Sequence, residues 1–142
     1  MEFKKILVPV DGSEAANNAF EYGLELTRMY NAELFLIYVA DVSEAAYPVM
    51  QVTLDRTGLA AVKERAEEIL GEMKAKVPAG TKLSAMVKIG IPGNVISHMV
   101  EENHVDLVVM GNSGKGSLSS FIMGSVSHYV IHHVKCPVLI VK

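Results

Sequence analysis

Cysteine and long apolar runs are both scarce in this sequence. Its 142 residues include one cysteine, Cys136, which excludes an internal disulfide and favours a reducing compartment. The longest apolar runs fall far short of the roughly 20 residues that cross a bilayer. The first residues, MEFKKILVPVDGS, lack the apolar core and the small-residue cleavage site of a signal peptide. We therefore predict a cytoplasmic protein that does not enter a membrane.

An excess of positive charge is also missing. The formal net charge is −3 and the isoelectric point is near 5.9, whereas proteins that bind nucleic acid usually carry a basic stripe. The composition, half hydrophobic and one fifth charged, is typical of an ordered globular protein. With no linker or internal repeat in sight, we predict one domain over residues 1–142 and no nucleic-acid partner.

Signatures of catalysis and of a closed metal site are absent as well. The sequence contains neither H-E-x-x-H nor G-x-S-x-G, and no pair of carboxylates can be located near its glycine-rich loop. His128 and His132 are spaced by four residues, beside His133, which raises the possibility of a metal site. Zinc needs further ligands, and neither Cys136 nor a nearby carboxylate obviously supplies one. Histidines favoured by the dipole at a helix end are the preferred interpretation.

Short apolar runs alternate with helical patterns along the whole chain. Short apolar runs predict five strands, at residues 5–10, 33–40, 82–90, 105–110 and 137–142, of which the alternating one at 82–90 is expected to be more exposed than the others. Apolar residues spaced by three and four predict four helices. The first begins near Glu14 and continues at least to Thr27, the second covers 59–73, the third runs from the turn at 90–93 to about Asn103, and the fourth covers 124–134. Ser13 is placed to cap the first of them. This alternation predicts an α/β fold with a mostly parallel sheet covered on both faces.

A glycine-rich loop, GNSGKGSLSSFIMGS, runs from Gly111 to Ser125 between a predicted buried strand and a helix. Its pattern is G-x2-G-x9-G-S. Glycines let backbone N–H groups approach an anion closely, and a helix N-terminus adds further donors. The loop is not a Walker A motif, because Ser117 stands where that motif has its lysine. It is not the G-x-G-x-x-G dinucleotide fingerprint either, because that motif follows the first strand of its unit. We predict a phosphate-binding loop; a merely flexible connection is the alternative.

Asp11 ends the first predicted strand, and the loops after the first and fourth strands are expected to share one edge of the sheet. A carboxylate there can accept hydrogen bonds from ribose hydroxyls. The alternative is a tight turn with Gly12, a common use of aspartate. Lys115 is equally consistent with binding phosphates and with being a solvated loop lysine.

These segments together resemble the universal stress protein family, and the glycine pattern is similar to that of its ATP-binding branch. The resemblance is carried by KKILVPVDGSEAA, LIYVAD, VKIGIPGNVI, VDLVVMGNSGKGSLSSFIMGSVS and CPVLIV. Residues 41–58 are the least family-like, and nothing is carried over there. The resemblance implies a three-layer sandwich whose five-stranded parallel sheet has the order 3-2-1-4-5, with helices on both faces.

The resemblance also implies a set of site residues. Adenine is expected against Pro9, Val10 and Val39, with Val10 and Val39 enclosing the flat base, and ribose at Asp11. The phosphates are expected at Gly111, Gly114, Gly124 and Ser125, in a site also lined by Met110, Ser113, Lys115, Val126 and Ser127. A Mg²⁺ or Mn²⁺ ion would be held through the phosphates. The number of phosphates is not specified by the glycines.

The family further implies a homodimer formed by the last strands, Pro137 to Val141. An apolar edge strand, which proteins tend to cover or pair, agrees with this. We therefore expect an ATP-binding protein that acts as a nucleotide-dependent stress-response or regulatory module. A slow ATPase or ATP-dependent transferase of the same α/β class is the alternative, although no catalytic residue can be nominated. A purely structural dimer is disfavoured by the intact glycine spacing.

Overall fold

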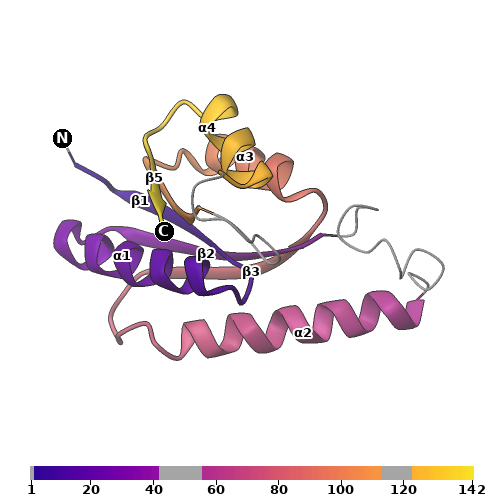
Figure 1. Cartoon of the computed structure of the whole chain (residues 1–142). Helices are drawn as coiled ribbons and strands as arrows, with labels where there is room; N and C mark the ends of the chain where they lie inside the picture. The colour runs from indigo at the N-terminus through magenta and orange to yellow at the C-terminus, as the bar shows by residue number, and fades with distance from the viewer. Residues whose placement is uncertain (1, 42–55, 113–122) are drawn as a thin grey trace.

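The computed structural model describes residues 2–41, 56–112 and 123–142 (Figure 1). Strands and helices alternate along these residues as the sequence predicts. Their bounds are β1 Lys5–Val10, α1 Glu14–Tyr30, β2 Glu33–Ala40, α2 Arg56–Lys74, β3 Leu83–Ile89, α3 Pro92–Asn103, β4 Leu107–Gly111, α4 Ser125–His133 and β5 Val138–Val141.

The strands form one parallel sheet in the order β3-β2-β1-β4-β5, which confirms the expected topology. Figure 1 shows α1 and α2 on one face of the sheet and α3 and α4 on the other. Two apolar clusters correspond to these layers. Phe20 of α1 and Ala66 of α2 belong to one cluster, while Ile96 of α3 and Val130 of α4 belong to the other. The fold is therefore a three-layer sandwich.

Strand β1 lies in the middle of the sheet and is buried on both faces. Ile6 and Val8 point into the α1/α2 cluster, whereas Leu7 points into the α3/α4 cluster. A strand covered on both sides needs apolar residues at every position, which is why this segment is a continuous apolar run rather than an alternating one. Strand β3 lies at an edge and is only partly buried, in agreement with its mixed sequence.

Helix termini follow the expected chemistry, and one of them corrects a strand boundary. Ser13 caps α1, because its hydroxyl oxygen accepts a hydrogen bond from the Ala16 N–H at 3.2 Å. Strand β4 begins at Leu107 and not at Val105 as predicted. His104 ends α3 in the left-handed conformation, and the Val105 N–H donates to the Val100 carbonyl at 3.0 Å. Val105 is buried but belongs to this helix ending.

Gly23 provides a test of the contact between α1 and the sheet. A Cβ atom there would overlap the Cγ2 of Val8, a fully buried and stiff side chain in β1. We expect Gly23→Ala to lower the free energy of unfolding by about 1–3 kcal/mol through overpacking.

The matched control is Gly71→Ala in the exposed face of α2, where nothing lies within 4 Å of the added atom. There the helix propensity of alanine should raise the free energy of unfolding by about 0.5–1 kcal/mol. Urea denaturation of both variants checks this, and equal stability of the two would contradict the packing argument.

Candidate functional site

The turn after β1 places Asp11 at the carboxyl edge of the sheet. The Ser13 N–H donates to the Asp11 Oδ1 at 2.8 Å, and Gly12 has a φ of 83°, a left-handed conformation that glycine adopts without strain. The turn role considered for Asp11 is therefore present. No other hydrogen bond reaches this half-buried carboxylate from the described residues, so its second oxygen retains its capacity to accept.

The end of β4 lies directly against the start of α1. A Cβ atom on Gly111 would lie 2.9 Å from the carbonyl carbon of Ala15 and 3.0 Å from the amide nitrogen of Ala16. The end of the fourth strand thus lies beside the segment that follows the first strand, as expected, while residues 113–122 of the second loop lie outside the described residues. This contact also gives Gly111 a packing role, because no larger residue fits between the strand end and the helix backbone.

Asn112 joins the two ends of the glycine-rich loop. Its carbonyl oxygen accepts the Gly124 N–H at 2.8 Å, and its own N–H donates to the Val141 carbonyl at 2.8 Å. The Ser127 hydroxyl also donates toward the carbonyl oxygens of Asn112 and Gly124, at 3.1 and 3.0 Å. The chain therefore leaves β4 and returns to α4 at one point. Ser113, Gly114 and Lys115 lie outside the described residues.

Helix α4 begins at this closure with its first turn uncapped by any side chain. Gly124 occupies the N-cap position and offers no side-chain oxygen, and Ser125, the first helical residue, is exposed. Backbone N–H groups of a first helical turn have no partner within the helix. Such a turn suits an anion, both through these donors and through the helix dipole.

The apolar candidates do not all lie together. Val39, Met110 and Val126 belong to the α3/α4 cluster, and Pro9 is half-buried. Val10 belongs instead to the α1/α2 cluster, with 2% of its surface exposed.

The expectation that the side chains of Val10 and Val39 enclose a flat base is therefore wrong. Val10 pairs in register with Tyr38, so Val39 is one residue further along and points to the opposite face of the sheet. The side chain of Val10 therefore does not reach the face of the sheet on which Val39 lies.

Two residue groups at this edge of the sheet were not among the site residues predicted from the sequence. The first is Asn112, which is buried although it is polar, and a search for hydrophobic patterns does not detect buried polar residues. The other is the turn from Gly90 to Pro92, which sits beside the end of β2 because the Gly90 N–H donates to the Ala40 carbonyl at 3.1 Å. The sequence signal that indicates this turn is the glycine and the proline on either side of Ile91, directly after a predicted strand.

Metal ligands and membrane segments were sought over the same residues. The described parts of the chain contain no group of three or more His, Cys, Asp and Glu side chains placed to hold a metal ion. None of the helices in those parts has the length and apolar character needed to cross a membrane. Burial raises the pKa of the Cys136 thiol, which packs against the α3/α4 cluster as a small apolar group.

This arrangement of strands, turn and closed loop has known counterparts. A model of the universal stress protein family matches residues 2–142. The chain belongs to the universal stress protein family. It is 34% identical over 148 residues to universal stress protein MJ0531 of Methanocaldococcus jannaschii, covering 99% of this chain and 82% of that protein. The solved structure of MJ0577, a universal stress protein from the same organism, is 31% identical, with a TM-score of 0.77 and coverage of 100% and 97%.

Two more distant structures share this fold and were solved with nucleotides. A universal stress protein in complex with cAMP is 22% identical, with a TM-score of 0.65 and coverage of 100% of this chain and 98% of the other. The universal stress protein from Archaeoglobus fulgidus in complex with dAMP is 18% identical, with a TM-score of 0.67 and full coverage of both chains. At these identities the likeness concerns the fold.

Ser127 provides a test of the loop closure. We expect Ser127→Ala to lower the free energy of unfolding by about 1 kcal/mol. The loss is modest because both carbonyl oxygens still accept a backbone hydrogen bond in the variant. The Asn112 carbonyl accepts the Gly124 N–H, and the Gly124 carbonyl accepts the His128 N–H. Ser125→Ala, at the exposed neighbouring position, serves as the control and should change stability by less than about 0.5 kcal/mol. Urea denaturation separates the two, and an undiminished stability of Ser127→Ala would refute the closure role of this buried hydroxyl.

Proposed function

We propose that this universal stress protein binds ATP at the carboxyl edge of its sheet and acts as a nucleotide-dependent stress-response or regulatory module. The observation that carries the proposal is the closure at Asn112. It holds both ends of a glycine-rich loop at the uncapped first turn of α4, on the edge where Asp11 lies. Relatives of the same fold bound to cAMP and dAMP support an adenine nucleotide as the ligand.

The phosphates belong at the start of α4 in this proposal. The N–H groups of its first turn and the exposed Ser125 hydroxyl donate to phosphate oxygens, and the absence of a side chain on Gly124 lets the anion approach the backbone. The motif assigns the same role to Gly111 and Gly114, with Ser113 and Lys115 beside them. Mg²⁺ or Mn²⁺ would be held through the phosphates, as the resemblance to the ATP-binding branch of the family implies.

Ribose and adenine belong over the ends of β1 and β2. The second carboxylate oxygen of Asp11 would accept a ribose hydroxyl, and the turn leaves it available because it uses only Oδ1. The base rests against the α3/α4 side of this edge, at Pro9, Val39 and Met110. Val10 would contribute only its backbone N–H and carbonyl groups, which can hydrogen-bond to the edge of a purine.

Gly124 provides the test of nucleotide binding. Its φ of −65° and ψ of 154° are extended values that valine adopts readily, so Gly124→Val adds bulk at the phosphate position without straining the backbone. Calorimetry with ATP and Mg²⁺ should give a dissociation constant in the micromolar range for the wild type, corresponding to about 8 kcal/mol. Binding by the variant should be lost while its circular dichroism is kept.

Gly71→Ala, which adds a methyl group to the exposed face of α2, is the control and should bind as the wild type does. Retained affinity in Gly124→Val would show that the phosphates lie elsewhere. Titrations with ADP, AMP and cAMP identify the preferred nucleotide, and phosphate release from the same samples measures any slow hydrolysis.

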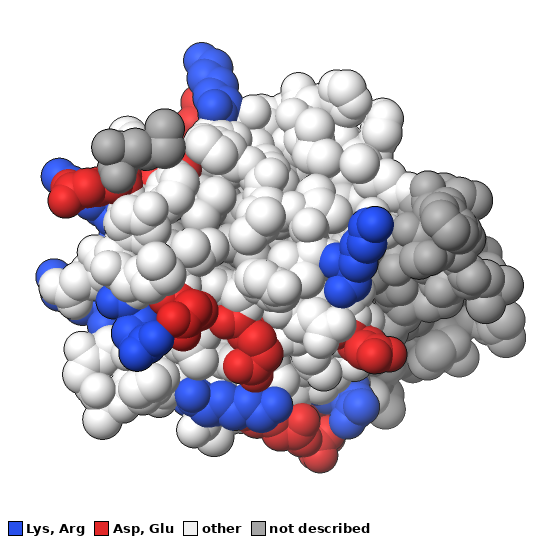
Figure 2. All heavy atoms as spheres, turned by 60° about the vertical axis from the view of Figure 1, so that its left-hand side comes forward, with Lys and Arg blue, Asp and Glu red and all other residues white. Residues whose placement is uncertain are grey.

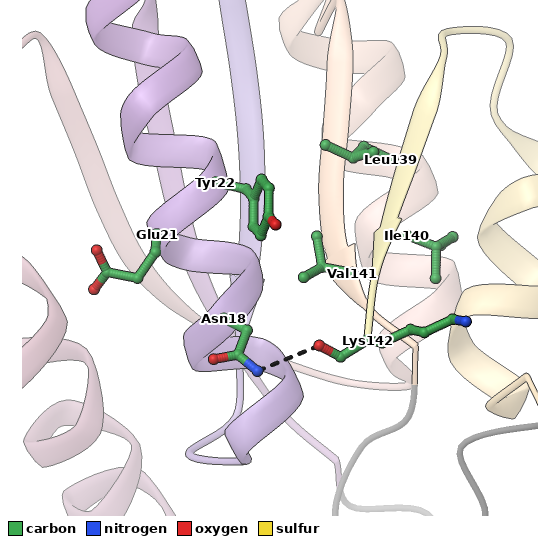
Figure 3. Close-up of a pocket in the computed structure, with 7 residues that line it drawn as sticks. All are labelled: Asn18, Glu21, Tyr22, Leu139, Ile140, Val141 and Lys142. Carbon is green, nitrogen blue, oxygen red and sulfur yellow. Dashed lines mark hydrogen bonds between the residues drawn. The ribbon is translucent and has the colours of Figure 1, made fainter.

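We also propose that the chain forms a homodimer through β5. This strand is at the edge of the sheet, beside a groove of about 610 Å³ between β5 and α1 (Figure 3). Leu139 and Tyr22, which line the groove, are 37% and 58% exposed. Glu21 and Lys142 also line the groove. Figure 2 shows a broad area near the centre of its view without Lys, Arg, Asp or Glu side chains. Exposed apolar side chains beside an unpaired edge strand suit a second copy of the chain.

Leu139→Lys tests the dimer. The wild type should elute as a dimer in size-exclusion chromatography with light scattering, and the variant as a monomer, because a lysine at an edge strand opposes pairing. Met29→Lys, at another exposed apolar residue on α1, is the control and should remain a dimer. A monomeric wild type, or a dimeric Leu139→Lys, contradicts the proposed interface.

A further inference from the structure

Helix α4 carries three of the five histidines of the chain, and two of them lie together on its outer face. His128 and His132 are four residues apart, and both are exposed. Their ring centroids lie 4.5 Å apart, with the rings tilted by 54°. The inner face of the helix is formed by Ser127 and Val130, which are buried. The two imidazoles therefore meet in solvent, away from the loop closure.

This spacing is the one that a shared metal ion requires. Imidazole nitrogens bind transition metals at about 2.0–2.1 Å. With a nitrogen–metal–nitrogen angle of about 90–105°, two such rings have centroids roughly 4.5–5 Å apart at that bond length. Histidines at positions i and i+4 of a helix bind one ion in this way, because the helix backbone sets their separation. The 4.5 Å between the ring centroids of His128 and His132 falls in this range.

We propose that His128 and His132 form a two-ligand site for a divalent transition-metal ion, with water completing the coordination. Imidazole is a ligand suited to Cu²⁺, Ni²⁺ and Zn²⁺, and affinity is expected to be highest for Cu²⁺. Mg²⁺ prefers oxygen ligands and should not bind here. The proposed ligands are the two imidazoles alone, whereas the site proposed for ATP uses the Ser125 hydroxyl and the backbone N–H groups of the first turn, so metal binding does not require a nucleotide.

His133 is not part of this pair. Its Nδ1 lies 2.7 Å from the carbonyl oxygen of Tyr129, and because a carbonyl can only accept, this nitrogen carries the hydrogen. Its ring stacks on that of Tyr129 at 3.7 Å between centroids and 7° between planes. His133 is therefore held against Tyr129, one position away from His132. A substitution of His133 is therefore the matched control, because it removes a histidine from the same helix without removing either proposed ligand.

A bound ion would link two successive turns of α4, a helix of nine residues. A ligand that binds only the folded state stabilises it in proportion to the logarithm of its concentration. Metal binding should therefore be visible both as direct association and as a higher melting temperature.

The test uses the full chain without an affinity tag. Isothermal titration with Ni²⁺, and electron paramagnetic resonance with one equivalent of Cu²⁺, should show one site with two nitrogen ligands. His128→Gln and His132→Gln should each lower the affinity at least tenfold, reduce the Cu²⁺ signal to one nitrogen, and abolish the Ni²⁺-dependent rise in melting temperature. Glutamine keeps the helix propensity and removes the ligand nitrogen.

His133→Gln and His98→Gln, the latter on the exposed side of α3, should bind metal as the wild type does. The proposal fails if either glutamine substitution at 128 or 132 leaves binding unchanged. It fails equally if His98→Gln or His133→Gln reduces binding as much, since the ion would then lie elsewhere. Mg²⁺ should give no rise in melting temperature beyond that of a matched ionic strength.

Discussion

The hydrogen bonds of the Asn112 backbone are the constraint on which the candidate site depends. Its N–H joins the end of β4 to β5, and its carbonyl receives the first residues of α4. Through these bonds the edge of the sheet, the glycine-rich loop and a helix N-terminus share one point. A parallel sheet whose winding reverses between β1 and β4 leaves a crevice at this edge. The closure thus brings the first-turn N–H groups of α4 to the edge where the topology offers room for a ligand.

Most of the fold could be predicted from the sequence because each layer of the sandwich requires a characteristic spacing of apolar residues. Strands covered on both faces require unbroken apolar runs, and helices covered on one face require apolar residues every three or four positions. The pattern was insufficient at Val105, which is apolar and buried but ends a helix. Burial alone does not distinguish a strand from a helix ending, since that depends on which carbonyl accepts the Val105 N–H.

The candidate site could be predicted less completely, for two physical reasons. Side-chain direction in a sheet depends on register between strands, which the sequence of either strand does not contain. This is why Val10 and Val39 were expected to enclose a flat base, whereas their side chains lie on opposite faces of the sheet. A glycine can also meet two demands at once. Gly111 follows a phosphate-binding pattern, yet its contact with Ala15 and Ala16 requires glycine even without a ligand.

Helix α4 uses three different parts of its surface for three different contacts. Its first turn meets the loop, and its inner side packs on α3, where a Cβ on Gly93 would lie 2.6 Å from the ring of Tyr129. Its outer face holds the histidine pair. The outer face and the closure are nevertheless linked through the backbone, because the His128 N–H donates to the Gly124 carbonyl at 3.0 Å. Ser127, whose hydroxyl donates to the Asn112 and Gly124 carbonyls, directly precedes His128, so a change at the closure also reaches the first histidine.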